Sequence, residues 1–200
     1  MKQLRTVLII STILCLSAII PACAPQKGVP DALSVIHSRK SVRHFTGQAV
    51  SKADLEEIIR AGMAAPTAVD RRPWSFVVVT DRKTMDDLAA GLPFAKMLKK
   101  AGATIIVCAI PDKAFDKKRE YALIDAGCAS ENILLAVEAL SLGAVWTAAY
   151  PDKGRMDHVR KVLKIPETVI PLNVIPVGVP TGEDKPRNKW DPAKIHWNIW

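Results

Sequence analysis

Apolar side chains recur at helical spacing in several stretches of this chain, each bounded by polar residues. The clearest stretch begins at residues 51–54, which resemble a capping box, and its apolar residues then recur every three or four positions until Pro66 ends it. A shorter stretch follows Asp31. We therefore predict helices over residues 31–39, 51–65, from Asp81 onward, 120–142 and about 153–163.

The longest of these helices, residues 120–142, is followed by Gly143, and glycine favours the left-handed conformation in which many helices end. Its sequence contains unusually small residues, namely Ala122, Ala126, Gly127, Ala129 and Ser130. Small side chains allow another backbone to approach closely, so we expect this helix to be central. The sequence leaves two explanations open: the helix is shared with a second subunit, or it is simply well buried.

Continuous apolar runs with many β-branched residues predict strands over residues 74–80, 104–110, 144–149 and 168–177. The first run is typical of a strand buried on both faces. The tail, residues 180–200, is polar but ends in tryptophans, so we expect it to pack across another surface. This order of elements predicts one domain with an α+β or three-layer αβα architecture.

The first residues have the pattern of a secretory signal: a charged start, an apolar centre and small residues at its end. Residues 20–23, Ile-Pro-Ala-Cys, resemble a bacterial lipobox, although Pro21 is unusual in one. We predict a lipoprotein-type signal peptide over residues 1–23 with lipidation at Cys23, a tether over 24–30 and the folded domain over 31–200. This predicts an exported, membrane-anchored lipoprotein of a bacterial cell envelope. Plain secretion, or an uncleaved anchor that faces the cytoplasm, are the alternatives.

Charge distribution and the spacing of Cys and His residues argue against several other classes of protein. The net charge of +8 is spread along the chain without a helix-turn-helix, zinc-finger or aromatic-interleaved signature, so we expect no nucleic-acid partner. Cys108 and Cys128 lie singly in apolar surroundings, where each is predicted to be a small buried hydrophobe. No His and Cys pair has metal-ligand spacing, so we expect no metal. The histidines are predicted to be surface or structural residues: His37, His44, His158 and His196.

Residues 38–43, Ser-Arg-Lys-Ser-Val-Arg, place three cations and two hydroxyls within one short segment. Arginine side chains match phosphate oxygens in a bidentate way, and a serine hydroxyl adds a further donor. The segment therefore indicates a phosphate-bearing ligand. A solvated basic surface is the alternative that this segment alone leaves open.

From about Val35 to the C-terminus, the chain resembles the nitroreductase family of flavin-dependent oxidoreductases. Four blocks in the right order carry the resemblance: residues 38–43, residues 64–74, the helix residues 125–136 leading into residues 142–147, and the late pair Lys185 and Arg187. The resemblance implies a dimeric three-layer αβα sandwich with a four-to-five-stranded, mainly antiparallel sheet. It also implies FMN bound at the interface of a homodimer, in a site that lacks the glycine fingerprint of a Rossmann fold.

The resemblance also implies roles for individual residues. Arg39, Ser41 and Arg187 would contact the phosphate and ribityl chain, Arg43 would lie at the flavin pyrimidine edge, and the backbone of Thr147 and Ala148 would face flavin N5, with no catalytic side chain assigned. Residues 66–68 would cover the flavin from the partner subunit. The full set of expected cofactor contacts is Arg39, Lys40, Ser41, Arg43, Pro66, Thr67, Ala68, Asp70, Trp146, Thr147, Ala148, Lys185 and Arg187.

Three residues depart from the family pattern. Lys40 replaces an arginine, Asp70 an asparagine and Arg72 a glutamine; the last two could pair with each other or reshape the mouth of the pocket. The resemblance implies hydride transfer from NAD(P)H or another donor, through FMN, to a small aromatic or quinone-like acceptor. A flavin-binding lipoprotein without NAD(P)H turnover, and a flavin reductase or dehalogenase-type variant, are the alternatives.

Overall fold

The computed structural model describes residues 31–200. The predicted signal peptide, the lipidation of Cys23 and the tether over residues 24–30 lie outside the described residues.

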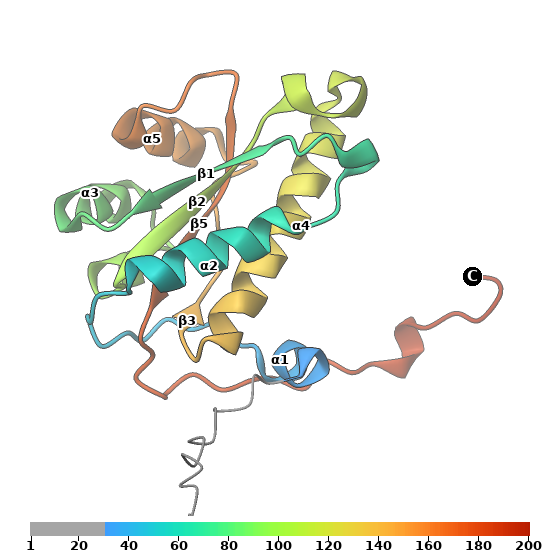
Figure 1. The fold of residues 1–200 in the computed structure, drawn as a ribbon, viewed down its shortest axis with the longest axis horizontal. Coiled ribbons are helices and arrows are strands. Elements are labelled where there is room, and N and C mark those ends of the chain that lie inside the picture. The colour runs from blue at the N-terminus through green and yellow to red at the C-terminus, as the bar shows by residue number, and fades with distance from the viewer. Residues whose placement is uncertain (1–30) are drawn as a thin grey trace, which may run out of the picture.

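Five α-helices occupy the described chain close to where the apolar periodicity predicts them (Figure 1). Four of them begin at a polar residue whose side chain accepts a backbone N–H of the first turn, at Asp31, Ser51, Asp81 and Asp152. Such caps satisfy amide groups that have no partner inside the helix. The helices are α1 (Ala32–Ser38), α2 (Lys52–Met63), α3 (Arg82–Gly91), α4 (Arg119–Ala139) and α5 (Lys153–Leu163).

One antiparallel sheet runs through the middle of the molecule, in the strand order β1-β2-β5-β3 with β4 also paired to β5. The long strands β2 and β5 pair along most of their length, with Ile105 opposite Ile175 and one irregularity after Val107. The strands are β1 (Trp74–Val79), β2 (Ala103–Ala109), β3 (Gly143–Ala144), β4 (Thr147–Ala148) and β5 (Ile170–Gly178).

Helices cover both faces of this sheet, which confirms the predicted three-layer αβα, α+β fold (Figure 1). Side chains alternate between the two faces of a strand. Accordingly Ile105 and Val107 of β2 join the apolar cluster under α2 and α4, whereas Ile106 and Cys108 join the cluster under α3 and α5. Burial of Cys108 confirms the prediction made for it, while Cys128 on α4 is only half-buried.

The prediction that β1 is buried on both faces is wrong. It is an edge strand with a single neighbour, β2, and its Val78 side chain is 41% exposed. The run of apolar residues is therefore not evidence of a central position. Apolar side chains also line the groove beside this edge, described below.

The single strand predicted over residues 144–149 is interrupted, and the structure forms two short strands, β3 and β4, in its place. Both keep the same register on β5: Ala144 lies opposite Val177, and Thr147 lies opposite Val174. That register sets Pro176 opposite the gap. Proline has no N–H to donate to a strand ladder, which accounts for a local loss of pairing there.

Helix α4 is central, as its small residues predict. Ala122, Ala126 and Ala129 are fully buried in this chain, and Gly62 of α2 packs so closely that a Cβ there would lie 2.9 Å from Ile133. By contrast, Gly127 has no neighbouring atom within 4 Å of a Cβ placed on it, so one side of α4 is open. Burial within the chain explains most of the small residues without a second subunit.

The tail leaves the sheet after β5 and runs past α1, and only its last part extends away from the rest of the described chain (Figure 1). Trp197 is 80% exposed and Trp200 is 98% exposed, so residues 31–200 do not supply the surface expected to cover the tail. Among residues 31–200, no helix has the length and apolar character needed to cross a membrane. The same residues contain no group of three or more His, Cys, Asp or Glu side chains arranged to hold a metal ion.

Candidate functional site

The segment after α1 and the start of the tail together form a basic basin. Residues 39–43 supply one wall and residues 183–189 the other, around a cavity of about 490 Å³. The two segments are more than a hundred residues apart in sequence. Their contact brings together, with the hydroxyl of Ser41, five cations predicted to bind the cofactor: Arg39, Lys40, Arg43, Lys185 and Arg187.

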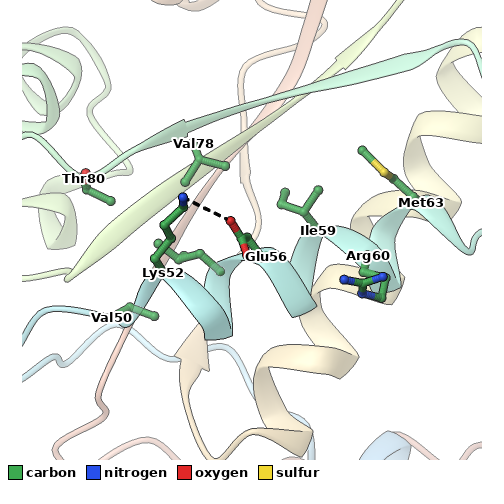
Figure 2. A pocket seen from close by; sticks show the side chains of 9 residues that line it. Val50, Lys52, Glu56, Ile59, Arg60, Met63, Val78 and Thr80 are labelled. Atoms are coloured by element: carbon green, nitrogen blue, oxygen red, sulfur yellow. Dashed lines mark ion pairs between the residues drawn. The ribbon is translucent and has the colours of Figure 1, made fainter.

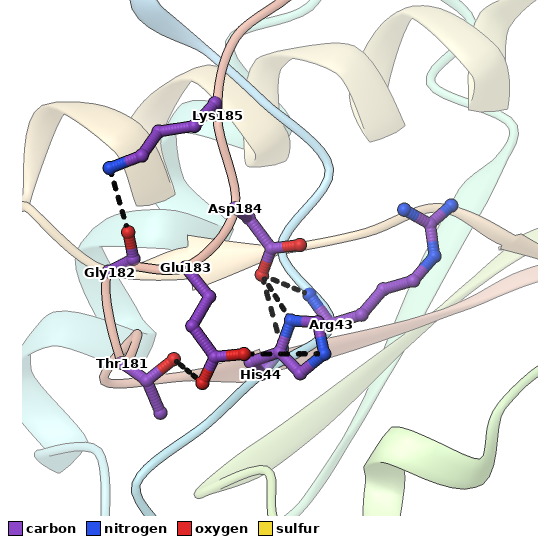
Figure 3. Close-up of polar contacts among 7 residues, drawn as sticks. All are labelled: Arg43, His44, Thr181, Gly182, Glu183, Asp184 and Lys185. Carbon is purple, nitrogen blue, oxygen red and sulfur yellow. Dashed lines mark hydrogen bonds and ion pairs between the residues drawn. The ribbon is translucent and has the colours of Figure 1, made fainter.

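Asp184 holds the two walls together (Figure 3). Its carboxylate accepts the backbone N–H groups of Arg43 at 2.9 Å and His44 at 3.2 Å, and lies 3.2 Å from the His44 ring. Partial burial pushes the pKa of Asp184 upward, but these hydrogen bonds outweigh it and hold the pKa below its usual value. His44 is therefore tied to the scaffold, as expected for a structural histidine.

The basin has more positive than negative charge available to a ligand. Six cations line it, against Glu183 and Asp184, and Asp184 is already engaged by backbone amides. Two of the cations are paired with acids of α4: Arg39 with Glu131 at 3.2 Å and Lys40 with Glu138 at 3.0 Å. Within residues 31–200, Arg43, Lys185, Arg187 and Lys189 form no ion pair, although Lys185 donates to the Gly182 carbonyl.

A second cavity, of about 460 Å³, lies next to the basin and shares Arg43 with it. Trp146, Thr147 and Ala148 line this cavity. The Thr147 hydroxyl donates to the Val174 carbonyl and its side chain is buried, so it is not free to meet a ligand. This leaves the backbone of Thr147 and Ala148 as the part that can face a cofactor, as the resemblance implies. Figure 3 shows the Arg43 side chain extending away from Asp184.

The loop that follows α2 lies apart from both cavities in this chain. Pro66, Thr67, Ala68 and Asp70 line neither of them. The buried carboxylate of Asp125 on α4 holds this loop by accepting the Ala68 N–H, at 3.2 and 3.3 Å from its two oxygens. A single chain therefore does not bring the loop to the basin, and a second subunit would have to.

Asp70 and Arg72 form a two-point ion pair, with Arg72 Nε 2.7 Å from one carboxylate oxygen. The sequence had left this pairing open. The hydrogen bond from Arg72 lowers the pKa of Asp70. Val69, Asp70 and Arg72 all have positive φ angles, of 45°, 55° and 51°, a conformation that costs energy in residues with side chains. The loop is thus held in one strained shape by contacts around it.

Several residues of the two cavities were not predicted. Lys189 joins the basin, and Phe94, Lys96 and Arg155 line the second cavity. Lys189 lies two positions beyond Arg187, so its positive charge next to a predicted phosphate ligand could have identified it from the sequence. The other three come from segments whose approach to Trp146 is decided by how α3 and α5 pack on the sheet.

A third cavity, of about 810 Å³ and thus larger than either of these two, is a groove between α2 and the edge strand β1 (Figure 2). Apolar side chains such as Ile59, Met63 and Val78 line it, and Lys52 pairs with Glu56 along the helix at 3.5 Å. None of the predicted cofactor residues lies in this groove. Size therefore does not identify the site of chemistry here.

Comparison with known proteins agrees with this geometry. The chain matches the family described as "Nitroreductase family" over residues 36–92 and 89–179. It is 39% identical over 170 residues to a Methanothermobacter thermautotrophicus protein provisionally named NADH dehydrogenase/NAD(P)H nitroreductase, covering 85% of this chain and 88% of that one. A solved structure of the same description from Parabacteroides distasonis is 48% identical, with a TM-score of 0.80, and the match covers 84% of this chain and 98% of that one.

A third relative contains the cofactor. It is the crystal structure of a protein from Desulfovibrio desulfuricans, provisionally described as a nitroreductase in complex with FMN, 25% identical with a TM-score of 0.73, covering 86% of this chain and 98% of that one. The chain therefore belongs to the nitroreductase family, a class of flavin-dependent oxidoreductases. Its cofactor is FMN, and homodimers and NAD(P)H donors are typical of the family.

The chemistry of the basin fits the phosphate end of FMN. A phosphate carries its charge on oxygens that guanidinium groups bind in a bidentate way, and Arg43 and Arg187 have no ion-pair partner among the described residues. The Ser41 hydroxyl lies in the same basin. The adjoining cavity, which is lined by the backbone of residues 147–148, offers the space that the isoalloxazine ring system of FMN would need.

Proposed function

We propose that this protein is an FMN-dependent NAD(P)H oxidoreductase that reduces electron-poor acceptors such as nitroaromatics or quinones. The observation that carries the proposal is the junction of two cavities at Arg43, one basic enough for a phosphate and one walled by the backbone of Thr147 and Ala148. When bound, FMN supplies the transfer of two electrons between donor and acceptor.

The residues of this chain would hold and tune that cofactor. Arg39, Ser41 and Arg187, with Lys40, Lys185 and Lys189 around them, would bind the phosphate and the ribityl chain. The positive charge of Arg43 would favour the reduced, anionic flavin, and the backbone at Thr147 and Ala148 would meet N5 without an ionisable side chain. Residues 66–70 would reach the flavin of the partner subunit in a homodimer.

The test is an absorbance spectrum of the FMN-loaded protein before and after anaerobic addition of NADH or NADPH. Bleaching of the flavin bands, followed by their return on adding a quinone, supports the proposal. A matched pair of variants sharpens it: Arg187→Met should lose FMN, while Lys161→Met, which removes an exposed cation of α5, should keep it. Failure of the wild-type protein to bind FMN would contradict the proposal.

A flavin-binding lipoprotein without NAD(P)H turnover is the second candidate, and the Asp70–Arg72 ion pair favours it. That pair replaces the amide side chains expected at the flavin edge, and its carboxylate cannot donate to a flavin carbonyl oxygen. Bound FMN that neither nicotinamide nucleotide bleaches is the result this candidate expects. The Asp70→Asn, Arg72→Gln double variant would then gain turnover.

We also propose that the chain is exported and anchored through a lipid on Cys23. The support is the sequence of residues 1–23 alone. Mass spectrometry of the N-terminal peptide of the mature protein tests it: a mature chain that begins at a lipid-modified Cys23 supports the anchor, and an intact Met1 contradicts it. An exported enzyme would need a donor outside the cytoplasm, such as a quinol or another protein.

A further inference from the structure

The second cavity carries more positive charge than a flavin ring requires. The inference drawn from this charge rests on the proposed function and extends it to the choice of acceptor. The phosphate of FMN already has a place in the basin formed by residues 39–43 and 183–189. Yet Lys96 and Arg155 line the neighbouring cavity together with Arg43. The flavin phosphate therefore does not account for those two additional cations.

Arg155 is held in one position from three sides. Its guanidinium lies over the Phe94 ring, 4.9 Å from the ring centre, and its Nη1 is 3.5 Å from the carbonyl oxygen of Ala148. Its Nε is 3.8 Å from a carboxylate oxygen of Asp152, whose other oxygen caps α5. Stacking on an aromatic ring and a nearby acid fix the orientation of the group, so little side-chain entropy is lost when a ligand binds.

The charge balance around the cavity is positive. Arg43, Lys96 and Arg155 line it, and none of its lining residues within the described chain is acidic. Asp152 offsets part of the Arg155 charge from outside the lining. Within residues 31–200, Lys96 forms no ion pair and is exposed. Two cations beside the backbone of Ala148 are therefore available to a ligand.

The cavity also offers flat apolar surface. Phe94 is 67% exposed and Trp146 is 37% exposed, and both line the same space. Large exposed aromatic side chains at a cavity suit a conjugated ring, which gains from burial and from stacking. The combination of aromatic surface with cations indicates a ligand that has both an aromatic ring and a negative charge.

We propose that this cavity selects electron acceptors that carry a carboxylate or similar anionic group on the reducible ring, and that Arg155 recognises that group. Reduction of a nitro group to nitroso then uses the two electrons and the hydrogen of NAD(P)H together with one proton from solvent, and releases NAD(P)⁺ and water. A guanidinium fixed over Phe94 binds a carboxylate by charge-assisted hydrogen bonds. Lys96 adds attraction without a fixed geometry.

Two acceptors of similar shape and different charge test the proposal: the anionic 4-nitrobenzoate, and the neutral 4-nitrobenzamide, whose nitro group is intrinsically the easier one to reduce. The full FMN-loaded chain is first reduced photochemically, without a nicotinamide donor, and is then mixed with each acceptor while flavin reoxidation is followed. The wild-type protein should be reoxidised by the benzoate with an apparent second-order rate constant about tenfold higher. Raising the ionic strength should narrow this difference.

Variants assign the preference to Arg155. Arg155→Met should remove most of the preference by slowing only the benzoate, and Arg155→Lys should keep part of it because the charge remains. Lys161→Met removes a cation from the exposed side of the same helix and should change nothing. The flavin spectrum and the thermal midpoint of each variant show whether the protein still folds and binds FMN.

The outcomes are distinct for this inference and for the proposed function. If both acceptors reoxidise the wild-type flavin at equal rates, the inference is overturned, while the proposed FMN-dependent oxidoreductase function still stands. An equal loss for both acceptors in Arg155→Met also overturns it, because the residue would then act on the flavin or on the fold. Failure to bind FMN removes the proposed function, and the inference with it.

Discussion

The contact between Asp125 and the loop after α2 gives a quantitative test of how the cofactor loop is held. Asp125 lies on α4, is 4% exposed, and accepts the Ala68 N–H with both oxygens, at 3.2 and 3.3 Å. Burial raises the pKa of this carboxyl above its usual value, and the Ala68 hydrogen bond offsets only part of that effect. A single backbone N–H group therefore stabilises a carboxylate whose charged form is disfavoured by burial.

Two substitutions separate the hydrogen bond from the charge. Asp125→Ala leaves the Ala68 N–H without its acceptor, and we expect the free energy of unfolding to fall by about 1–3 kcal/mol. For a domain of this size, that lowers the thermal midpoint by about 2–4 °C for each kcal/mol. Asp125→Asn keeps an acceptor and removes the charge, so at neutral pH it should cost less than the alanine variant.

The contribution of Asp125 to the free energy of unfolding should increase as the pH falls. A carboxyl whose pKa is raised on folding contributes most to stability when protonated, below its unfolded pKa near 3.8, and this contribution is lost as the pH rises through the raised folded value. The wild-type protein should therefore gain stability relative to Asp125→Asn as the pH falls from about 7 to about 4. The other carboxyl groups titrate alike in both proteins and cancel in the difference.

The assay is denaturant unfolding followed by circular dichroism, at several pH values and with matched FMN occupancy. If alanine and asparagine variants were equally stable at neutral pH, the hydrogen bond to Ala68 would contribute nothing. If the difference between the wild-type protein and Asp125→Asn were constant with pH, or changed in the opposite direction, the charge on Asp125 would not be destabilised by burial.

Four further predictions concern the core, a close backbone contact, a buried cysteine and the basin. Ile175→Ala should lower the free energy of unfolding by about 2–5 kcal/mol in denaturant titration, because Ile175 of β5 is fully buried in the apolar cluster under α2 and α4, and a loss below about 1 kcal/mol would contradict this packing. Gly102→Ala should lower the thermal midpoint, since its Cβ would lie 2.3 Å from the Gln48 carbonyl oxygen, and an unchanged midpoint would mean that this approach relaxes freely. Burial raises the pKa of Cys108 to about 12, so peptide mapping after alkylation should find it unmodified in the native protein and modified in guanidinium; rapid native labelling would refute its burial. Asp184→Ala should weaken FMN binding about tenfold in a fluorescence titration, because the backbone N–H groups of Arg43 and His44 lose the acceptor that joins the two walls of the basin, and an unchanged affinity would show that the tail is held by other contacts.

The sequence predicted the ligand chemistry of the site better than it predicted the contacts that bring the segments of the site together. Residues 38–43 carry the phosphate-binding side chains within one short segment, so their residue types alone indicated the ligand. Arg187 was found through its place in a family pattern. Neither signal showed that Asp184 would join the two segments, or that Lys40 would pair with Glu138 of α4. Those contacts connect residues that are 141 and 98 positions apart in the sequence.

Helix positions followed from the sequence because the interactions that form them are local. Caps at Ser51 and Asp152, and apolar residues three or four positions apart, act within one or two turns. Strand existence was predicted for the same reason. Strand position was not, because β1 looks like a central strand until its single neighbour is known, and Pro176 interrupts a ladder only where it lies opposite Val145.

The sequence by itself therefore determined the elements, their order, the αβα class and the phosphate chemistry of residues 38–43. Only the tertiary structure decided which face each element covers, which segments meet at Arg43, and that Arg155 stacks on Phe94 beside Ala148. The physical reason is the range of the interactions. Propensity and capping act over a few residues, whereas cavities form where distant segments pack, and that packing depends on burial and steric fit across the whole chain.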